Sequence, residues 1–200
     1  MTLSAFPPQG LRHGATAVLE TERLVLRAPL LGDAPAIARL ANDRRVAENA
    51  ARIPHPYTIA DAESFIASAN IPGGEVSFAI TQRDDETLVG MCGLAAATAS
   101  SAELGYWLGV PFWGNGIGTE AVRAAIDHAF TELGLEALAA GARVTNPASR
   151  RVLEKCGFQW TGVGLYRIRA IASSAPSDRF RLERGIWASL KSWRDVRRSS

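Results

Sequence analysis

The clearest pattern of hydrophobic positions lies in and just after residues 119–132, where apolar side chains recur every three or four residues. These side chains are Val122, Ala125, Ile126, Ala129, Phe130 and Leu133. Because an α-helix completes a turn in about 3.6 residues, this spacing places them on one face. Gly134 follows, and a glycine just past the last apolar position is typical of a helix end. The pattern predicts a helix with one buried side.

Shorter apolar and alternating runs predict the strands of a sheet. Residues 77–81 and 88–94 flank a polar turn, as in an antiparallel hairpin. Residues 95–101 lead to a third strand at 103–108, whose alternation gives it two different faces. Those faces carry Glu103, Gly105 and Trp107 on one side and Leu104, Tyr106 and Leu108 on the other. Further strands are expected at 23–27, 138–144, 161–168 and 178–186, the last two flanking an Ala- and Ser-rich loop.

Three further helices are predicted from capping residues and periodicity. Asp33 is expected to cap the first, and Thr58 with Asp61 has the spacing of a capping box for the second. Residues 72–74, Pro-Gly-Gly, are expected to end that second helix, and residues 149–156 form the third. Helices leading into a hairpin meander and then a strand–helix–strand–helix unit indicate a single domain of the α+β class.

Size and composition fit a domain that folds without disulfides or metal. The chain has 200 residues, of which 47% are hydrophobic, enough for a sizeable core. No apolar run approaches the roughly 20 residues of a membrane helix, and the first twenty residues lack a signal-peptide pattern. Cys92 and Cys156 have no metal-type spacing, and we interpret them as free thiols. We therefore expect a cytoplasmic protein that is not bound to a membrane.

Charge and local composition suggest how the chain is divided. Residues 1–19 carry Pro, Gly and polar side chains without a period and are expected to form a loose arm. The domain is expected to span residues 20–187, and residues 188–200 form a basic tail, the end of which has the pattern of a short amphipathic helix. The net charge of +2 is too small to argue for nucleic acid by itself.

A glycine-rich stretch leaves the strand at 103–108 and enters the long helix. It reads Trp113, Gly114, Asn115, Gly116, Ile117, Gly118 and Thr119. Glycines allow the backbone to approach a ligand closely, and a helix N-terminus offers unpaired N–H groups and partial positive charge. Together they form a cradle suited to a pyrophosphate. A plain tight turn would explain the same glycines, whereas a Walker loop is excluded because no Gly-Lys-Ser/Thr occurs.

A second motif, in residues 146–158, identifies a family. Its sequence, Asn-Pro-Ala-Ser-Arg-Arg-Val-Leu-Glu-Lys-Cys-Gly-Phe, resembles the N-x-x-S-x-R-V-L-E-K-x-G-F segment of GNAT acetyltransferases, particularly the RimJ/RimL type that acts on ribosomal-protein N-termini. The glycine loop is similar to that family's CoA motif, Q/R-x-x-G-x-G/A, with Trp113 where Gln or Arg is commonest. Residues 22–27, 54–58 and 103–108 also resemble this branch, so the resemblance runs from about residue 20 to 187.

The resemblance implies a fold and a cofactor, acetyl-CoA. The fold would be a single GNAT-like α+β domain with a mixed, mostly antiparallel sheet of about 6–7 strands, a splayed central pair and helices on both faces. Backbone at Leu108 and Val110 would hold pantetheine in the splay. The residues implied for the pyrophosphate loop are Trp113, Gly114, Asn115, Gly116, Ile117, Gly118 and Thr119. The Asn146 amide would bind pantetheine or the loop, and a helix cap is the other interpretation of that residue.

The implied reaction is direct attack of a primary amine on the thioester in a ternary complex, which needs neither metal nor enzyme thiol. Ser149 would lie near the sulfur and protonate the leaving thiolate, or it simply caps the helix. Glu103 would accept the proton of the amine, directly or through water, or it is an ordinary exposed carboxylate. His55 is a further candidate for lining the acceptor site, and Cys156 is expected in the core. Other GNAT members place a catalytic tyrosine in this helix, and residues 146–158 contain none.

Two other function classes stay open, as does the acceptor. The same fold would serve as a non-catalytic module that binds CoA or a peptide. The basic tail, with Trp187 and Trp193, would suit a nucleic-acid contact, although the chain lacks a wide basic pattern. The acceptor would be the N-terminal amine of a ribosomal protein, a small amine, an amino acid or an antibiotic, chosen by loops near 43–57 and 169–178. A monomer and a homodimer are equally compatible with the sequence.

Overall fold

The structure is a computed structural model, which describes residues 17–69, 71 and 75–198. Within them, one eight-stranded sheet has the order β1-β2-β3-β4-β5-β6-β8-β7. Its strands are β1 (Leu19–Glu20), β2 (Leu24–Arg27), β3 (Val76–Gln82), β4 (Leu88–Thr98), β5 (Ser101–Leu108), β6 (Ala137–Arg143), β7 (Gln159–Ile168) and β8 (Ser173–Glu183). In this described sheet β5 and β6 run parallel, and every other neighbouring pair is antiparallel. The predicted α+β class is confirmed.

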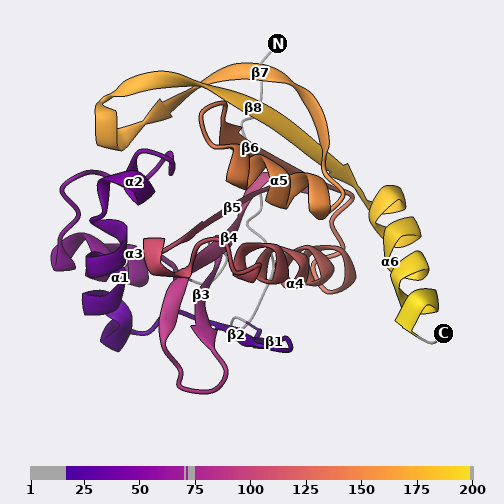
Figure 1. Cartoon of the computed structure of the whole chain (residues 1–200), viewed down its shortest axis with the longest axis horizontal. Coiled ribbons are helices and arrows are strands. Elements are labelled where there is room, and N and C mark those ends of the chain that lie inside the picture. Colours follow the sequence, from indigo (N-terminus) through magenta and orange to yellow (C-terminus); the bar gives the residue numbers. More distant parts are fainter. Residues whose placement is uncertain (1–16, 70, 72–74, 199–200) are drawn as a thin grey trace, which may run out of the picture.

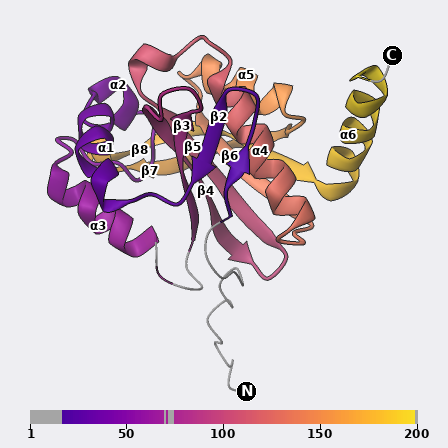
Figure 2. The ribbon, with the colours of Figure 1, turned by 90° about the horizontal axis from the view of Figure 1, so that it is seen from below.

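Helices cover both faces of the sheet, as predicted (Figures 1 and 2). They are α1 (Ala34–Ala41), α2 (Arg44–Ala47), α3 (Ile59–Ala69), α4 (Ile117–Thr131), α5 (Pro147–Lys155) and α6 (Arg184–Arg198). Strand alternation sends Phe78 and Ile80 of β3 into the main core with α4, while Ala79 between them packs with α1 and α3 on the other side. Fully burying a side chain such as Phe78 contributes about 1.5–3 kcal/mol, so the two cores fix the sheet between its helices.

The described sheet has eight strands, one more than the upper end of the expected six to seven. The additional strand is β1, whose two residues pair with β2, Leu19 opposite Leu26. A two-residue strand is too short to show a period in the sequence. Leu19 thus belongs to the sheet rather than to the expected arm, and residues 1–16 of that arm lie outside the described residues. Residues 72–74, expected to end α3, also lie outside them.

The predicted splay between the two central strands is confirmed. Parallel pairing of β5 with β6 begins at Ser101 opposite Ala137 and ends at Leu104 opposite Ala140. Both strands continue beyond that point, each held by its other neighbour, so that Leu108 still pairs with β4 and Arg143 with β8. The backbone edge of β5 past Leu104 therefore faces an open wedge instead of a neighbouring strand.

Two segments that were expected to be loops are strands. β4 continues to Thr98, with Ala95 opposite Glu103, although residues 95–101 were expected to be a connection. The Ala- and Ser-rich segment before residue 178 belongs to β8, and only a short 3-10 turn, η3 (Arg169–Ile171), and Ala172 separate it from β7. Alanine, serine and proline have low strand propensity, but pairing with a neighbouring strand overrides it. The long β7–β8 hairpin arches over the molecule, and its tip lies beside α2 (Figure 1).

The capping predictions had mixed outcomes. The capping box of α3 is confirmed, because the Thr58 N–H donates to the Asp61 carboxylate at 2.9 Å and the Asp61 N–H donates to Thr58 Oγ1 at 3.2 Å. The prediction for α1 was wrong: Asp33 stands at the cap position, but its side chain makes no cap hydrogen bond. Its carboxylate instead forms a forked ion pair with Arg27 and accepts from the Leu30 N–H.

The expected boundary between domain and tail, at residues 187 and 188, falls inside helix α6. Trp187 is 9% exposed, lies 5.1 Å from the Phe130 ring and donates its indole N–H to Asp127 Oδ1 at 2.6 Å. The start of α6 is therefore anchored on α4, and Trp187 is a packing residue rather than a nucleic-acid contact. Trp193, further along α6, is exposed. None of the described helices is both long and apolar enough to cross a membrane.

Candidate active site

A cavity of about 1430 Å³ follows the splay between β5 and β6. Its walls come from the end of β5, the glycine loop, the start of α5, the segment after α2 and the β7–β8 hairpin. Sites for single small ligands usually measure about 300–1,000 Å³. The cavity is therefore large enough to hold a long cofactor and a second substrate together.

The glycine loop has the backbone conformation that the sequence predicts for an anion cradle. Gly114 and Gly116 have φ of +80° and +79°, in the left-handed region that other residues rarely adopt. Gly116 caps α4, and the Glu120 N–H donates to its carbonyl at 3.1 Å. The amides of Ile117, Gly118 and Thr119 precede that first helical hydrogen bond and so have no intrahelical acceptor. The helix N-terminus thus presents free donors and partial positive charge to the cavity.

The loop is joined to β5 by Trp113. Its indole N–H donates to the Leu108 carbonyl at 2.8 Å, so that carbonyl already has a partner. Val110 lies after the strand in a 3-10 turn, η2 (Val110–Phe112), and its carbonyl accepts from the Trp113 N–H at 3.2 Å. Of the predicted cofactor residues, Val110 and Asn115 do not line the cavity, whereas the others do.

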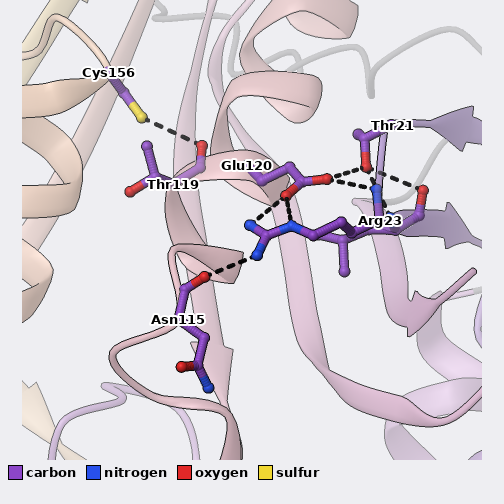
Figure 3. A network of polar contacts seen from close by, with 7 residues as sticks. Thr21, Arg23, Asn115, Thr119, Glu120 and Cys156 are labelled. Carbon is purple, nitrogen blue, oxygen red and sulfur yellow. Dashed lines mark hydrogen bonds and ion pairs between the residues drawn. The ribbon is translucent and has the colours of Figure 1, made fainter.

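A polar network ties the loop to the first strands, and its members Thr21 and Arg23 were not among the candidate site residues (Figure 3). Arg23 forms an ion pair with Glu120 of α4 at 2.6 Å and donates to the Asn115 carbonyl at 3.0 Å. Thr21 Oγ1 donates to the same Glu120 carboxylate at 2.6 Å. The only sequence signal for this network is the family resemblance of residues 22–27.

The start of α5 brings two predicted residues together with one that was missed. Asn146 Oδ1 accepts from the Ser149 N–H at 3.1 Å, so the helix-cap interpretation of Asn146 holds. The Tyr106 hydroxyl donates to Ser149 Oγ at 3.1 Å from the neighbouring strand β5. Burial raises the pKa of Tyr106 to about 12, and the hydrogen bond to Ser149 opposes that shift. Tyr106 is therefore protonated at neutral pH and acts as a donor, leaving the Ser149 proton free to point into the cavity.

Glu103 lies on the other face of β5. Because side chains alternate along a strand, Glu103 and Trp107 face α1 and α3, while Leu104 and Tyr106 face α4 and α5. The Glu103 side chain is exposed to the cavity, and no Lys or Arg among the described residues forms an ion pair with it. The splay thus has a free carboxylate on one side and a hydroxyl pair on the other.

Hydrogen bonds to backbone carbonyls close the far end of the cavity. Arg143, at the end of β6, donates to the Glu48 carbonyl at 2.8 Å, and Arg169 of the hairpin donates to the carbonyls of Ala51 and Arg52 at 3.1 and 3.3 Å. The Arg169 contacts join the hairpin tip to the segment after α2, and the Arg143 contact joins β6 to it. Of the remaining candidates, His55 is exposed and does not line the cavity.

Cys156 is buried in the main core, as predicted. Its thiol donates weakly to the Thr119 carbonyl at 3.7 Å, which places it behind the cofactor loop rather than in the cavity (Figure 3). Cys92 is buried in the same core, and burial raises the pKa of its thiol to about 12. Cys92 lines the cavity, but its raised pKa leaves it inactive as a nucleophile, and Cys156 does not line the cavity.

Comparison with known proteins identifies the family. The model of the acetyltransferase (GNAT) domain matches residues 23–159. The uncharacterized N-acetyltransferase YoaA of Bacillus subtilis is 34% identical over 73% of this chain and 85% of its own. Spermidine N-acetyltransferase from Vibrio cholerae, solved with CoA and spermine, has a TM-score of 0.72 at 22% identity, covering 84% of this chain and 99% of its own. Mycobacterium smegmatis RimJ, solved with CoA-disulfide, has a TM-score of 0.70 at 22% identity over 84% and 86%.

The two solved structures show that this chain shares their fold. The family model and YoaA show that its amino-acid sequence is also similar to that of acetyltransferases. The family model covers both motifs on which the sequence prediction rested, the glycine loop and residues 146–158. The chain belongs to the GNAT family of acetyltransferases and is an acyltransferase that uses acetyl-CoA as its donor.

Proposed function

We propose that this enzyme transfers the acetyl group to a primary amine by direct attack in a ternary complex. The observation that carries the proposal is that Glu103 and Ser149 line one cavity, with Glu103 on one face of β5 and Ser149 hydrogen-bonded to Tyr106 on the other. A thioester lying in the splay would present its carbonyl carbon toward Glu103 and its sulfur toward Ser149. The amine would then approach from one side while the thiolate leaves on the other.

The two side chains account for both protons of the reaction. At neutral pH the acceptor is mostly ammonium and must lose a proton to attack, and Glu103 accepts it directly or through a water. The C–N bond forms and the C–S bond breaks, the Ser149 hydroxyl donates its proton to the thiolate sulfur, and Ser149 regains a proton, through water, from the nitrogen as it loses its second proton and becomes the amide. Tyr106 acts through Ser149, because its donated hydrogen bond occupies one lone pair of Ser149 Oγ and so orients the serine proton.

The cofactor would be bound mainly by backbone groups of β5 and of the glycine loop. Pantetheine would follow the edge of β5 toward Leu108, and the pyrophosphate would bind the amides of the loop residues that line the cavity, Gly114 and residues 116–119. Free N–H groups at a helix N-terminus and two glycines in the left-handed region support this assignment. Asn146 would act from the cap of α5, where its carbonyl oxygen is already bound and its NH₂ group is free to donate.

For the acceptor we propose an N-terminal amine of a protein, with a ribosomal protein as the first candidate, or a small amine. The hairpin roof over the cavity supports an acceptor that enters as a thin chain end rather than as a folded surface. Related proteins differ in acceptor: the Vibrio enzyme is named for spermidine and the Mycobacterium enzyme is a RimJ. We also propose that the enzyme acts in the cytoplasm, where acetyl-CoA and such acceptors occur together.

The proposal is tested by measuring thiol release from acetyl-CoA with a panel of N-terminal peptides and small amines, each product being identified by mass spectrometry. We expect release to depend on the amine and one acetyl group to be added to it. The Glu103→Gln and Ser149→Ala variants serve as controls for chemistry. A chain that binds acetyl-CoA but releases no thiol with any amine would instead be a non-catalytic module.

A further inference from the structure

Residues 22–27 resemble the family but have no part in the function proposed above. Leu24 and Leu26 of this segment are fully buried, which explains the apolar half of its alternation. Arg23 lies immediately before the first of these packing positions, and its side chain is 50% exposed, so burial does not explain it. Its contacts lead across the structure to the cofactor loop.

The Arg23 guanidinium touches two parts of that loop (Figure 3). Nε donates to Glu120 Oε2 at 2.7 Å, Nη2 lies 2.6 Å from the same oxygen, and Nη1 donates to the Asn115 carbonyl at 3.0 Å. The Arg23 backbone N–H adds a bond to Glu120 Oε1 at 2.9 Å. One side chain just before β2 therefore bridges the first turn of α4 and the residue between the two left-handed glycines.

This bridge acts on the part of the loop that is hardest to hold. Gly114 and Gly116 flank Asn115, and glycine has more backbone freedom than any other residue. A loop that must be ordered when its ligand binds loses affinity in proportion to the freedom it gives up. Fixing the Asn115 carbonyl before the cofactor arrives removes part of that cost, because the amides on either side of it are then already placed.

The charges at the loop lead to the same conclusion. Glu120 lies in the first turn of α4, one residue beyond the amides that would bind phosphate, and an unpaired carboxylate there would repel an anion. Burial acts to raise the pKa of Glu120, but hydrogen bonds from Thr21 and Arg23 outweigh it and lower that pKa, so Glu120 is charged. Arg23 cancels this charge, and a Cβ at Gly116 would lie only 3.4 Å from its Nη2.

We propose that Arg23 is a positioning residue for acetyl-CoA, which fixes the cofactor loop in its binding conformation and neutralises Glu120 beside the pyrophosphate site. This inference rests on the proposed role of the loop. It gives the Arg23–Glu120 pair a function that an exposed ion pair elsewhere on the surface lacks, since such pairs contribute little.

The test compares two acetyl donors in two variants. Acetyl-pantetheine carries the thioester without the pyrophosphate or the phosphorylated adenosine, so the ratio of kcat/KM for acetyl-CoA to that for acetyl-pantetheine reports the contacts of that whole part of the cofactor, the pyrophosphate included. Arg23→Met keeps the length of the side chain and removes the charge. Arg83→Met is the matched control: Arg83 is 48% exposed, pairs with Glu20 and donates to the Thr21 carbonyl beside the same strands, yet it does not contact the loop.

We expect Arg23→Met to lower the donor ratio by about 10- to 100-fold, as expected for lost hydrogen bonds to a charged group, with the rate for acetyl-pantetheine nearly unchanged. Arg83→Met should keep the wild-type ratio. If Arg23→Met does not fold, Arg23→Lys gives the same comparison with a smaller loss, because lysine keeps the charge but cannot form the forked contact.

A wild-type donor ratio in the folded Arg23 variant would overturn the inference. An equal loss for both donors gives that same ratio and would make Arg23 a purely structural residue. A wild-type enzyme that does not prefer acetyl-CoA to acetyl-pantetheine would remove the proposed role of the loop and this inference with it. A preference that survives in the Arg23 variant removes the inference alone.

Discussion

The two ends of the cavity are built in different ways. At the cofactor end, the groups that face the ligand are backbone amides of the glycine loop and the unpaired edge of β5. At the acceptor end, the Arg143 and Arg169 side chains donate to carbonyls of the segment after α2, and the Arg169 backbone N–H adds one bond to Ala51. Backbone geometry tolerates many changes of side chain, whereas a side-chain contact is lost with a single substitution.

The two ends also differ in how firmly they are held. Helix α4 carries the cofactor loop, and residues such as Val122, Ile126 and Phe130 fix it in the main core with at most 2% exposure. Helix α2 has four residues, and the hairpin above it is joined to the segment after α2 by hydrogen bonds from Arg169. Regions with few buried contacts open at lower free-energy cost. The difference suggests a fixed cofactor end that serves any acetyl transfer and an adaptable acceptor end that decides the amine.

The largest effect is expected at the cofactor end, where acetyl-CoA affinity should depend on the backbone conformation of the glycine loop. Gly116→Val adds a branched side chain at φ +79°, beside Arg23 and in the path of the pyrophosphate. We expect a loss of acetyl-CoA affinity of at least about 100-fold, equivalent to roughly 3 kcal/mol, measured by calorimetry.

Gly134→Val is the control for strain alone. Gly134 lies past the other end of α4 with φ +64°, and a Cβ there would meet no atom within 4 Å. Both variants should lose about 1–3 kcal/mol of unfolding free energy, because both place a branched residue in the left-handed region. Equal loss of cofactor affinity in the two variants would show that strain, and not the loop, is responsible.

Glu103→Gln tests the acceptor side of the splay. The substitution keeps the shape and removes the base, so we expect a rate about 100-fold lower near pH 7, with acetyl-CoA affinity unchanged. As pH rises toward the pKa of the amine, more acceptor is already deprotonated, and the deficit should narrow by pH 9. Glu63→Gln, an exposed carboxylate of α3 that does not line the cavity, should behave as wild type. A deficit that is constant with pH would argue against proton transfer to Glu103.

The hydroxyl pair on the opposite side should have a smaller effect. We expect Ser149→Ala to lower kcat by about 10-fold, since a water can replace it in part, and Tyr106→Phe to lower it less. Because Tyr106 acts through Ser149, the double variant should be no slower than Ser149→Ala. With its pKa raised to about 12, Tyr106 stays protonated from pH 6 to 9, so its effect should not vary over that range. If the double variant lost activation free energy equal to the sum of the two single losses, Tyr106 and Ser149 would act independently.

Most of the fold could be predicted from the sequence because its periodic segments are also its buried ones. The long helix, the hairpin of β3 and β4 and the alternation of β5 all follow from apolar spacing. The segments at 95–98 and 173–177 could not be found in this way. Their Ala, Ser and Pro residues have weak strand propensity, and they are strands because long neighbours pair with them, a tertiary effect that no local pattern carries.

The residues of the candidate site also fall into those that a local sequence pattern predicts and those that it does not. The glycine loop and residues 146–158 are contiguous motifs, so sequence alone placed them. Tyr106 and Arg23 could not be assigned in the same way, because their partners are 43 and 97 residues away along the chain. Alternation showed that Tyr106 faces inward and resemblance marked residues 22–27, but only the folded chain shows that one reaches Ser149 and the other Glu120.

The smallest effect is expected at the roof of the acceptor end, where Arg143→Met removes the hydrogen bond to the Glu48 carbonyl. Loosening this segment should raise the KM of the amine about three- to tenfold, as expected for part of one charged hydrogen bond, and leave acetyl-CoA affinity unchanged. Arg44→Met is a matched control, because Arg44 contacts the side chain of the same Glu48 at 2.6 Å on the solvent side. If Arg143→Met instead weakened acetyl-CoA binding and left the amine KM unchanged, the two ends of the cavity would not be the separate units proposed here, and the roof would have to be assigned to the cofactor.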